Sequence, residues 1–297
     1  MTGVHCSRRE ALCGAMIVTT TLIASEGVKA AERGRQSGLV PLDGIGVYYE
    51  IHGSPLDGRT VPLVLLHGGA LTIEAAFSPG LIARFARTRP VIAIEQQGHG
   101  HTPDRPERPI TVEQLVRDTA GVLSHLRVRQ AVLLGHSLGG IVATGLSIRH
   151  PAMVRSMTTL GTPYRLEGFR DELVRLQRDP TLSPSPELVK ILPTETDYAS
   201  WRASFERVAP EPKTYERILE RLNTMLATWP GWSDDEMRSI GAPMLVAIGD
   251  NDFVRLEHAE RMAHLVANGR LAVLPGTTHL DIIKRDAWLE PMMEALT

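Results

Sequence analysis

Short, almost uninterrupted runs of Val, Ile and Leu alternate with longer amphipathic segments along most of this 297-residue chain. Strands with such continuous apolar sequences are buried on both faces, which is typical of parallel sheets covered by helices. The segments between the runs have helical periodicity, as in 111–126, where Thr111 and Gln114 have the spacing of a capping box. The sequence therefore predicts an α/β fold with a mostly parallel sheet of about eight strands flanked by helices. The individual strands are expected at 47–51, 61–66, 91–94, 131–134, 156–160, 244–248 and 271–274.

The alternation is interrupted once, over residues 164–238. This stretch has no convincing strand and consists of amphipathic segments joined by proline-rich ones such as RDPTLSPSPELVK. The strand pattern resumes at Pro243. We interpret 164–238 as a helical cap, or lid, inserted between two strands of one sheet. The α/β core then comprises residues 31–163 and 239–297.

The first 30 residues have the pattern of an export signal. Arg8 and Arg9 precede the mostly apolar stretch ALCGAMIVTTTLIAS, and Val28 and Ala30 occupy the −3 and −1 positions before a possible cleavage site. A transmembrane helix needs about 20 apolar residues, so the stretch is too short to span a bilayer comfortably. The paired arginines partly match a twin-arginine signal. We expect a periplasmic or secreted bacterial protein if the signal operates, and a cytoplasmic one if the segment is only a disordered leader or follows a misassigned start.

Composition and charge exclude several classes of protein. The net charge is −2 and Lys and Arg form no long run, which argues against nucleic acid or an anionic membrane surface as a partner. Both cysteines, Cys6 and Cys13, lie in the expected signal, so the mature chain would have no thiol for a disulfide or a zinc site. The sequence has no H-E-x-x-H motif. We expect a small-molecule substrate, no metal, no cofactor and no stable membrane insertion, and the sequence leaves the oligomeric state open.

The stretch VLLGHSLGG places Ser137 in a Gly-x-Ser-x-Gly pattern between a predicted strand and a predicted helix that starts near residue 141. This is the context of a nucleophile elbow, a strained turn that presents a serine hydroxyl at the top of a sheet. Because the turn is tight, Gly135 and Gly139 must lack side chains, and His136 completes the motif. We predict that Ser137 is a nucleophile; the alternative is an ordinary turn serine.

A serine nucleophile needs an adjacent base that is oriented by an acid. In this type of fold the chain order is Ser, then Asp or Glu, then His. Asp250 and Asp252 follow the strand PMLVAIG, and His279 follows the next strand, so all reach the same edge of the sheet as Ser137. We predict His279 as the base and Asp252 as the acid. Asp250, next to the strand end, is the reserve acid and is better placed to cap the turn.

A tetrahedral intermediate also needs donors for its oxyanion. The turn LLHGG after the predicted strand 61–66 ends in Gly69, and Leu138 follows Ser137 at the start of a helix. We predict that the backbone N–H groups of Gly69 and Leu138 form the oxyanion hole. The alternative for LLHGG is a plain turn.

Six segments, YYEIHG, PLVLLHGG, VIAIEQQGHGHT, LLGHSLGG, VAIGDNDFV and LPGTTH, occur in this order. Over residues 40–297 the chain thus resembles the α/β-hydrolase superfamily, in the branch with a serine nucleophile and a helical cap after the sixth strand. The resemblance implies the α/β-hydrolase fold and a Ser-His-Asp triad. Because the elbow carries Ser137 and not Asp, it points away from haloalkane dehalogenases and epoxide hydrolases.

We therefore expect a cofactor-free serine hydrolase that cleaves a carboxylic ester, or a related acyl bond, of a small to medium, largely apolar substrate. The triad alone does not separate this activity from C–C bond hydrolysis of a diketone or dienoate, perhydrolysis or acyl transfer. A ligand receptor without turnover is the alternative outside the enzymes.

Overall fold

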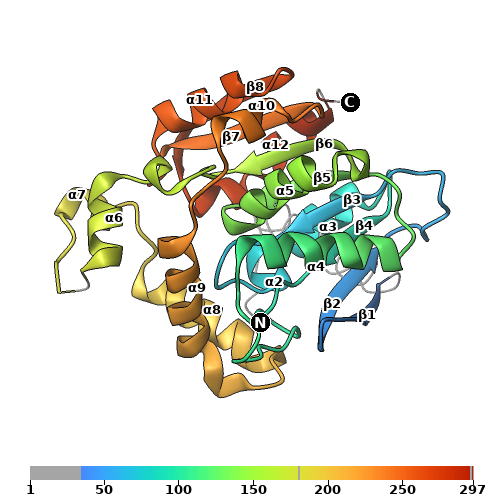
Figure 1. Cartoon of the computed structure of the whole chain (residues 1–297), viewed down its shortest axis with the longest axis horizontal. Coiled ribbons are helices and arrows are strands. Elements are labelled where there is room, and N and C mark those ends of the chain that lie inside the picture. The colour runs from blue at the N-terminus through green and yellow to red at the C-terminus, as the bar shows by residue number, and fades with distance from the viewer. Residues whose placement is uncertain (1–34, 180, 295, 297) are drawn as a thin grey trace, which may run out of the picture.

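The computed structural model describes residues 35–179, 181–294 and 296. The expected export signal, residues 1–30, and both cysteines lie outside the described residues. Eight strands of the described part form one sheet, which runs through the middle of the molecule (Figure 1). They are β1 (Gln36–Leu42), β2 (Ile45–His52), β3 (Leu63–Leu66), β4 (Val91–Ile94), β5 (Ala131–His136), β6 (Val154–Leu160), β7 (Met244–Asn251) and β8 (Gly269–Thr278).

The sheet has the order β1-β2-β4-β3-β5-β6-β7-β8. β2 pairs antiparallel with both β1 and β4, and every other neighbouring pair is parallel. The mostly parallel sheet expected from the sequence is thus confirmed. β1 was not among the expected strands, because its sequence QSGLVPL lacks a buried apolar run: it is largely exposed at the sheet edge and contains a proline.

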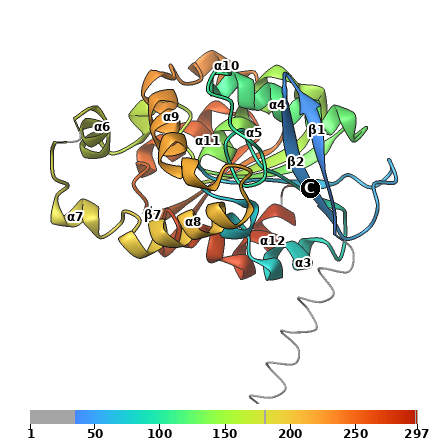
Figure 2. The same ribbon diagram turned by 90° about the horizontal axis from the view of Figure 1, so that it is seen from below.

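Helices cover both faces of the sheet. Residues of α4, α5 and α11 pack with the sheet in one apolar cluster, and residues of α2, α3 and α12 pack in a second, so the two sets lie on opposite faces (Figure 2). The described helices of the core are α2 (Ile73–Ala76), α3 (Pro79–Phe85), α4 (Val112–His125), α5 (Leu138–Arg149), α11 (Leu256–Leu265) and α12 (Asp286–Glu294), with short 3-10 helices at Pro151–Met153 and Asp281–Lys284.

The first turn of α4 shows where local pattern and tertiary structure differ. Thr111 caps the helix as expected, and its side chain accepts a hydrogen bond from the Gln114 backbone N–H. The reciprocal half of the expected capping box does not form. The Gln114 side-chain amide instead donates to the buried Asp118 carboxylate at 3.0 Å, because that carboxylate is brought within reach one turn along the helix.

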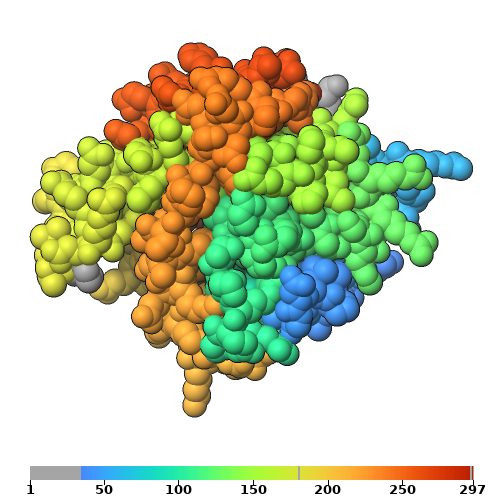
Figure 3. Space-filling model, in the orientation of Figure 1, coloured from blue at the N-terminus to red at the C-terminus, as the bar shows by residue number. Residues whose placement is uncertain are grey.

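Residues 161–243, called the insertion below, connect β6 to β7 and contain helices and no strand among their described residues. The insertion packs along one side of the core (Figure 3). Thr72 and Ser204 share a hydrogen bond of 2.8 Å across this contact, and Arg221 pairs with Asp104 of the core. The division of the chain at residues 163 and 238 stays a prediction. The helices of the insertion are α6 (Asp171–Arg178), α7 (Pro186–Val189), α8 (Glu195–Val208), α9 (Tyr215–Thr228) and α10 (Asp234–Arg238), with short 3-10 helices at Leu166–Gly168 and Pro212–Thr214.

The parallel strands bring several loops to one edge of the sheet. β3, β5, β6, β7 and β8 all end there, so the segments that follow them converge over the insertion side of the core. None of the helices in the described ranges is both long enough and apolar enough to cross a membrane.

Candidate active site

Ser137 occupies a sharp turn between β5 and α5. Its backbone angles are φ 50° and ψ −113°, a conformation that residues with a Cβ rarely adopt. The glycines on either side are required by space: a Cβ on Gly135 would lie 2.4 Å from the carbonyl oxygen of Gly139, and one on Gly139 would lie 2.0 Å from that of Leu66. α5 begins at Leu138 and not near residue 141, because the turn leads directly into the helix.

Asp252 and His279 are joined by a hydrogen bond of 2.8 Å between Oδ1 and Nδ1. Both side chains are buried. The same Oδ1 accepts the backbone N–H of Val254 at 2.8 Å, and Arg170 of the insertion donates from Nε to the backbone carbonyl of Asp252 at 3.1 Å. The carboxylate is therefore held on the loop after β7 in a position where it orients the imidazole.

Asp250 lies two residues away but does not contact His279. Its exposed carboxylate accepts the backbone N–H groups of Gly276 and Thr277, each at 3.0 Å. These hydrogen bonds lower the pKa of Asp250. Asp250 thus ties the end of β7 to the segment that leads to His279.

Gly161, directly after β6, leaves the space that Asp252 and His279 occupy. Its φ is +53°, and a Cβ there would lie 2.7 Å from Asp252 Oδ2 and 2.8 Å from His279 Nδ1. No role was predicted for Gly161 from the sequence. In the sequence, Gly161 is only a glycine that follows a predicted strand, and glycine is common at such turns.

Two further side chains hold His279. His136 Nε2 donates to the backbone carbonyl of His279 at 2.9 Å, and burial lowers the pKa of His136 to about 3. The ring of Phe253 stacks on the imidazole with 3.9 Å between ring centroids. His136, predicted only as part of the elbow motif, therefore links that turn to the loop after β8. The contact of Phe253 with His279 was not predicted from the sequence.

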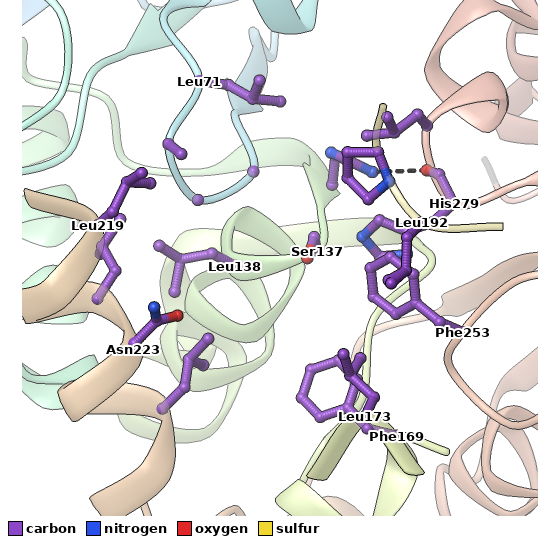
Figure 4. Close-up of a pocket in the computed structure, with 18 of the residues that line it drawn as sticks. Leu71, Ser137, Leu138, Phe169, Leu173, Leu192, Leu219, Asn223, Phe253 and His279 are labelled. Carbon is purple, nitrogen blue, oxygen red and sulfur yellow. Dashed lines mark hydrogen bonds between the residues drawn. The ribbon is translucent and has the colours of Figure 1, made fainter. Parts of the chain in front are cut away.

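Ser137 and His279 line the same cavity, and Figure 4 shows the Ser137 side chain beside the ring of His279. Within the described ranges, the Ser137 hydroxyl makes no hydrogen bond. A hydrogen bond from a nucleophile to its base is often long or misaligned without substrate and tightens when substrate binds. The structure thus brings Ser137, His279 and Asp252 to one place.

The turn after β3 lies against this cavity. Gly69 and Leu138 both line it, and neither backbone N–H has an acceptor within the described part of the chain. The next N–H, that of Ala70, is taken by His99 Nε2 at 3.0 Å. Ala70 has φ +65°, in the left-handed region that few residues other than glycine adopt.

His67 and His99 fix this turn from behind. His67 Nδ1 donates to the Gly68 carbonyl at 2.8 Å and its Nε2 accepts the Gln96 N–H at 3.0 Å. Burial lowers the pKa of His67 to about 3 and that of His99 to about 4. Both rings therefore stay neutral and can accept a backbone N–H. No role was predicted for His99 from the sequence.

The cavity has a volume of about 210 Å³, somewhat below the size that is usual for drug-sized ligands. Its walls come from the core and from α6, α8 and α9 of the insertion (Figure 4). Most of the lining side chains are apolar, among them Leu71, Ile141, Phe169, Leu173, Leu192, Leu219, Leu222, Met225, Leu226 and Phe253.

Comparison with known proteins finds similar proteins that are named as hydrolases. The hydrolase YugF of Bacillus subtilis is 32% identical over 250 residues, which cover 80% of this chain and 89% of that protein. An (E)-2-((N-methylformamido)methylene)succinate hydrolase of Acinetobacter baylyi is 27% identical over 239 residues, covering 75% and 85%.

Among solved structures, the fold is similar to that of a 2-hydroxy-6-oxo-6-phenylhexa-2,4-dienoate hydrolase of Rhodococcus, with a TM-score of 0.70 and 19% identity over 88% of this chain and 98% of that one. The model of the alpha/beta hydrolase family matches residues 63–290. With the elbow turn, the sheet order and this match together, the chain belongs to the alpha/beta hydrolase family.

Proposed function

We propose that this hydrolase is a serine esterase that cleaves a carboxylic ester, or a related acyl bond, of a small to medium, largely apolar substrate. The observation that carries the proposal is the buried Asp252–His279 hydrogen bond beside a serine held at φ 50° in the same cavity. A serine that only filled a turn would need neither the strained backbone nor a histidine oriented by a buried carboxylate.

In the proposed mechanism Ser137 Oγ attacks the carbonyl carbon of the ester while His279 Nε2 takes the hydroxyl proton. Asp252 accepts the Nδ1–H and so fixes the tautomer in which Nε2 can act as a base. As negative charge develops on the carbonyl oxygen, this oxygen accepts hydrogen bonds from the N–H groups of Gly69 and Leu138.

The tetrahedral intermediate then collapses, and the leaving alkoxide takes the proton from His279. Water, deprotonated by the same imidazole, attacks the acyl group on Ser137. A second tetrahedral intermediate, stabilised by the same donors, releases the carboxylic acid and returns the proton to Ser137.

A fluorophosphonate probe tests the proposal, because it reacts with an activated serine and not with an ordinary one. We expect stoichiometric labelling of the wild-type protein and none of Ser137→Ala, together with hydrolysis of short p-nitrophenyl esters by the wild type alone. Equal labelling of the two proteins, or none of the wild type, would contradict the proposal.

A second candidate is cleavage of a different bond in a substrate that carries carboxylates. The name of the Acinetobacter relative specifies a substituted succinate as its substrate. A dienoate, the substrate of the C–C bond hydrolysis considered above, is likewise an anion. Turnover of such a compound at a higher kcat/KM than any neutral ester would favour this candidate.

We also propose that residues 1–30 direct export by a twin-arginine route. N-terminal sequencing of the protein from the periplasm of an expressing bacterium should start at or near residue 31. Changing both arginines of the segment to lysine should retain the longer chain in the cytoplasm. An unprocessed wild-type chain in the cytoplasm would contradict this proposal.

A further inference from the structure

The wall of the catalytic cavity is uncharged. Among the described residues, no Asp, Glu, Lys or Arg lines it. Apart from His136, Ser137 and His279, the polar side chains of the lining are those of Gln177, Tyr198, Trp201 and Asn223. A carboxylate bound here would therefore find only neutral hydrogen-bond donors.

Asn223 is the polar group at the α9 side of the cavity. It lies one turn after Leu219, and Figure 4 shows its amide projecting from α9 into the space opposite the His279 side. In the described ranges the Asn223 side chain has no hydrogen-bond partner within the protein. An amide in this position can donate to or accept from a neutral polar group of a ligand, but it carries no charge.

The cavity continues outward between α6 and α9. A second, outer hollow of about 580 Å³ shares Gln177, Leu219 and Asn223 with it. The charged residues on the wall of this outer hollow are Glu216 and Glu220. Glu216 pairs with Arg202, whereas no cation pairs with Glu220 in the described part of the chain. The outer end of the space is thus weakly acidic.

We infer that this site selects substrates with an uncharged acyl group and rejects acyl groups that end in a carboxylate. The inference rests on the proposed function and names the substrate class for the same site. It predicts that anionic dienoates and succinates, the class of the second candidate, are poor substrates of this chain.

The physical reason is desolvation. A carboxylate that leaves water for an apolar cavity loses its hydration, and this loss is recovered only where a cation or several hydrogen-bond donors replace the water. No cation lines the cavity in the described ranges, and the charged side chains that line the outer hollow, Glu216 and Glu220, are acidic. A neutral alkyl chain of the same length loses no such hydration and gains apolar contacts.

Two esters that differ only at the far end of the acyl chain test the inference. p-Nitrophenyl hexanoate and mono-p-nitrophenyl adipate release the same leaving group and have the same number of chain carbons, but only the adipate ends in a carboxylate. We expect kcat/KM to be at least about 100-fold higher for the hexanoate. A ratio near 1, or a preference for the adipate, would overturn the inference.

A charge placed at the polar end of the cavity should change this preference. Asn223→Lys introduces a cation on the cavity wall at an exposed position of α9 that can hold a longer side chain without repacking the core. We expect the hexanoate-to-adipate ratio to fall at least 10-fold. Thr224→Lys is the matched control, because Thr224 lines only the outer hollow. An equal fall in both variants would show a bulk charge effect and overturn the assignment to the cavity.

Binding without turnover separates this inference from the proposed function. Saturation-transfer NMR on the Ser137→Ala variant should detect methyl hexanoate and not monomethyl adipate, and equal transfer to both would overturn the inference. If fluorophosphonate labels Ser137 while the adipate ester is the better substrate, the substrate class is wrong and the serine mechanism stands. If methyl hexanoate binds selectively while no probe labels Ser137, the mechanism is wrong and the substrate class stands.

Discussion

Replacing Ser137 by glycine should stabilise the folded protein while removing the proposed nucleophile. The serine adopts φ 50° and ψ −113°, and a residue with a Cβ in such a sparsely populated region costs about 1–3 kcal/mol. Glycine avoids most of this cost, but its greater freedom in the unfolded chain offsets about 0.4–1 kcal/mol. Since the hydroxyl makes no hydrogen bond in the described residues, its loss adds little. The expected net gain is about 1 kcal/mol.

Urea unfolding of the wild type, Ser137→Gly and Ser137→Ala measures this difference. The alanine variant is the matched control, because it also lacks the hydroxyl but keeps the Cβ and with it the strain. We expect the glycine variant to have the highest midpoint, with an unchanged m value. If Ser137→Gly unfolded at the same or a lower urea concentration than Ser137→Ala, the reasoning that this turn stores backbone strain would be refuted.

Three other changes follow from the same geometry. Asp252→Asn should lower kcat/KM for ester hydrolysis on the order of 10³- to 10⁴-fold, because the imidazole loses its orienting carboxylate; steady-state kinetics with a loss below 10-fold would contradict this. Gly161→Ala places a Cβ within 3 Å of Asp252 and His279 and should lower both the melting temperature and kcat/KM, whereas an unchanged scanning calorimetry trace would argue against the crowding. Lowering the pH from 7 to 5 should destabilise the fold, since burial holds the native pKa of several histidines at about 3 to 4, below their unfolded value of about 6.5, so the unfolded chain binds more protons over this range. The histidines concerned are His67, His99 and His136, and each is expected to lower the free energy of unfolding by about 2 kcal/mol between pH 7 and pH 5. Equal urea midpoints at the two pH values would contradict this prediction.

The strands and the elbow turn could be predicted because their signals are local. A strand buried on both faces needs a continuous apolar run, and the tight turn at Ser137 needs glycines at fixed spacing. β1 was missed because an edge strand has one neighbour and much exposed surface, so its sequence need not be apolar. The start of α5 was placed three residues late because the turn itself looks like a loop in sequence.

The chain order of serine, acid and histidine, and the glycine turn after β3, could be identified from motifs alone, because each follows a recognisable strand. The contacts that hold these loops in place could not be predicted from the sequence. His136 reaches the backbone of a residue 143 positions away, and His99 accepts an N–H from a turn that precedes it by 29 positions. Gly161 leaves space for two side chains from the loops after β7 and β8. Periodicity and spacing describe neighbours along the chain, whereas these contacts arise only once parallel strands align their ends. The uncharged cavity wall likewise depends on which faces of α6 and α9 meet the core, which is decided by packing.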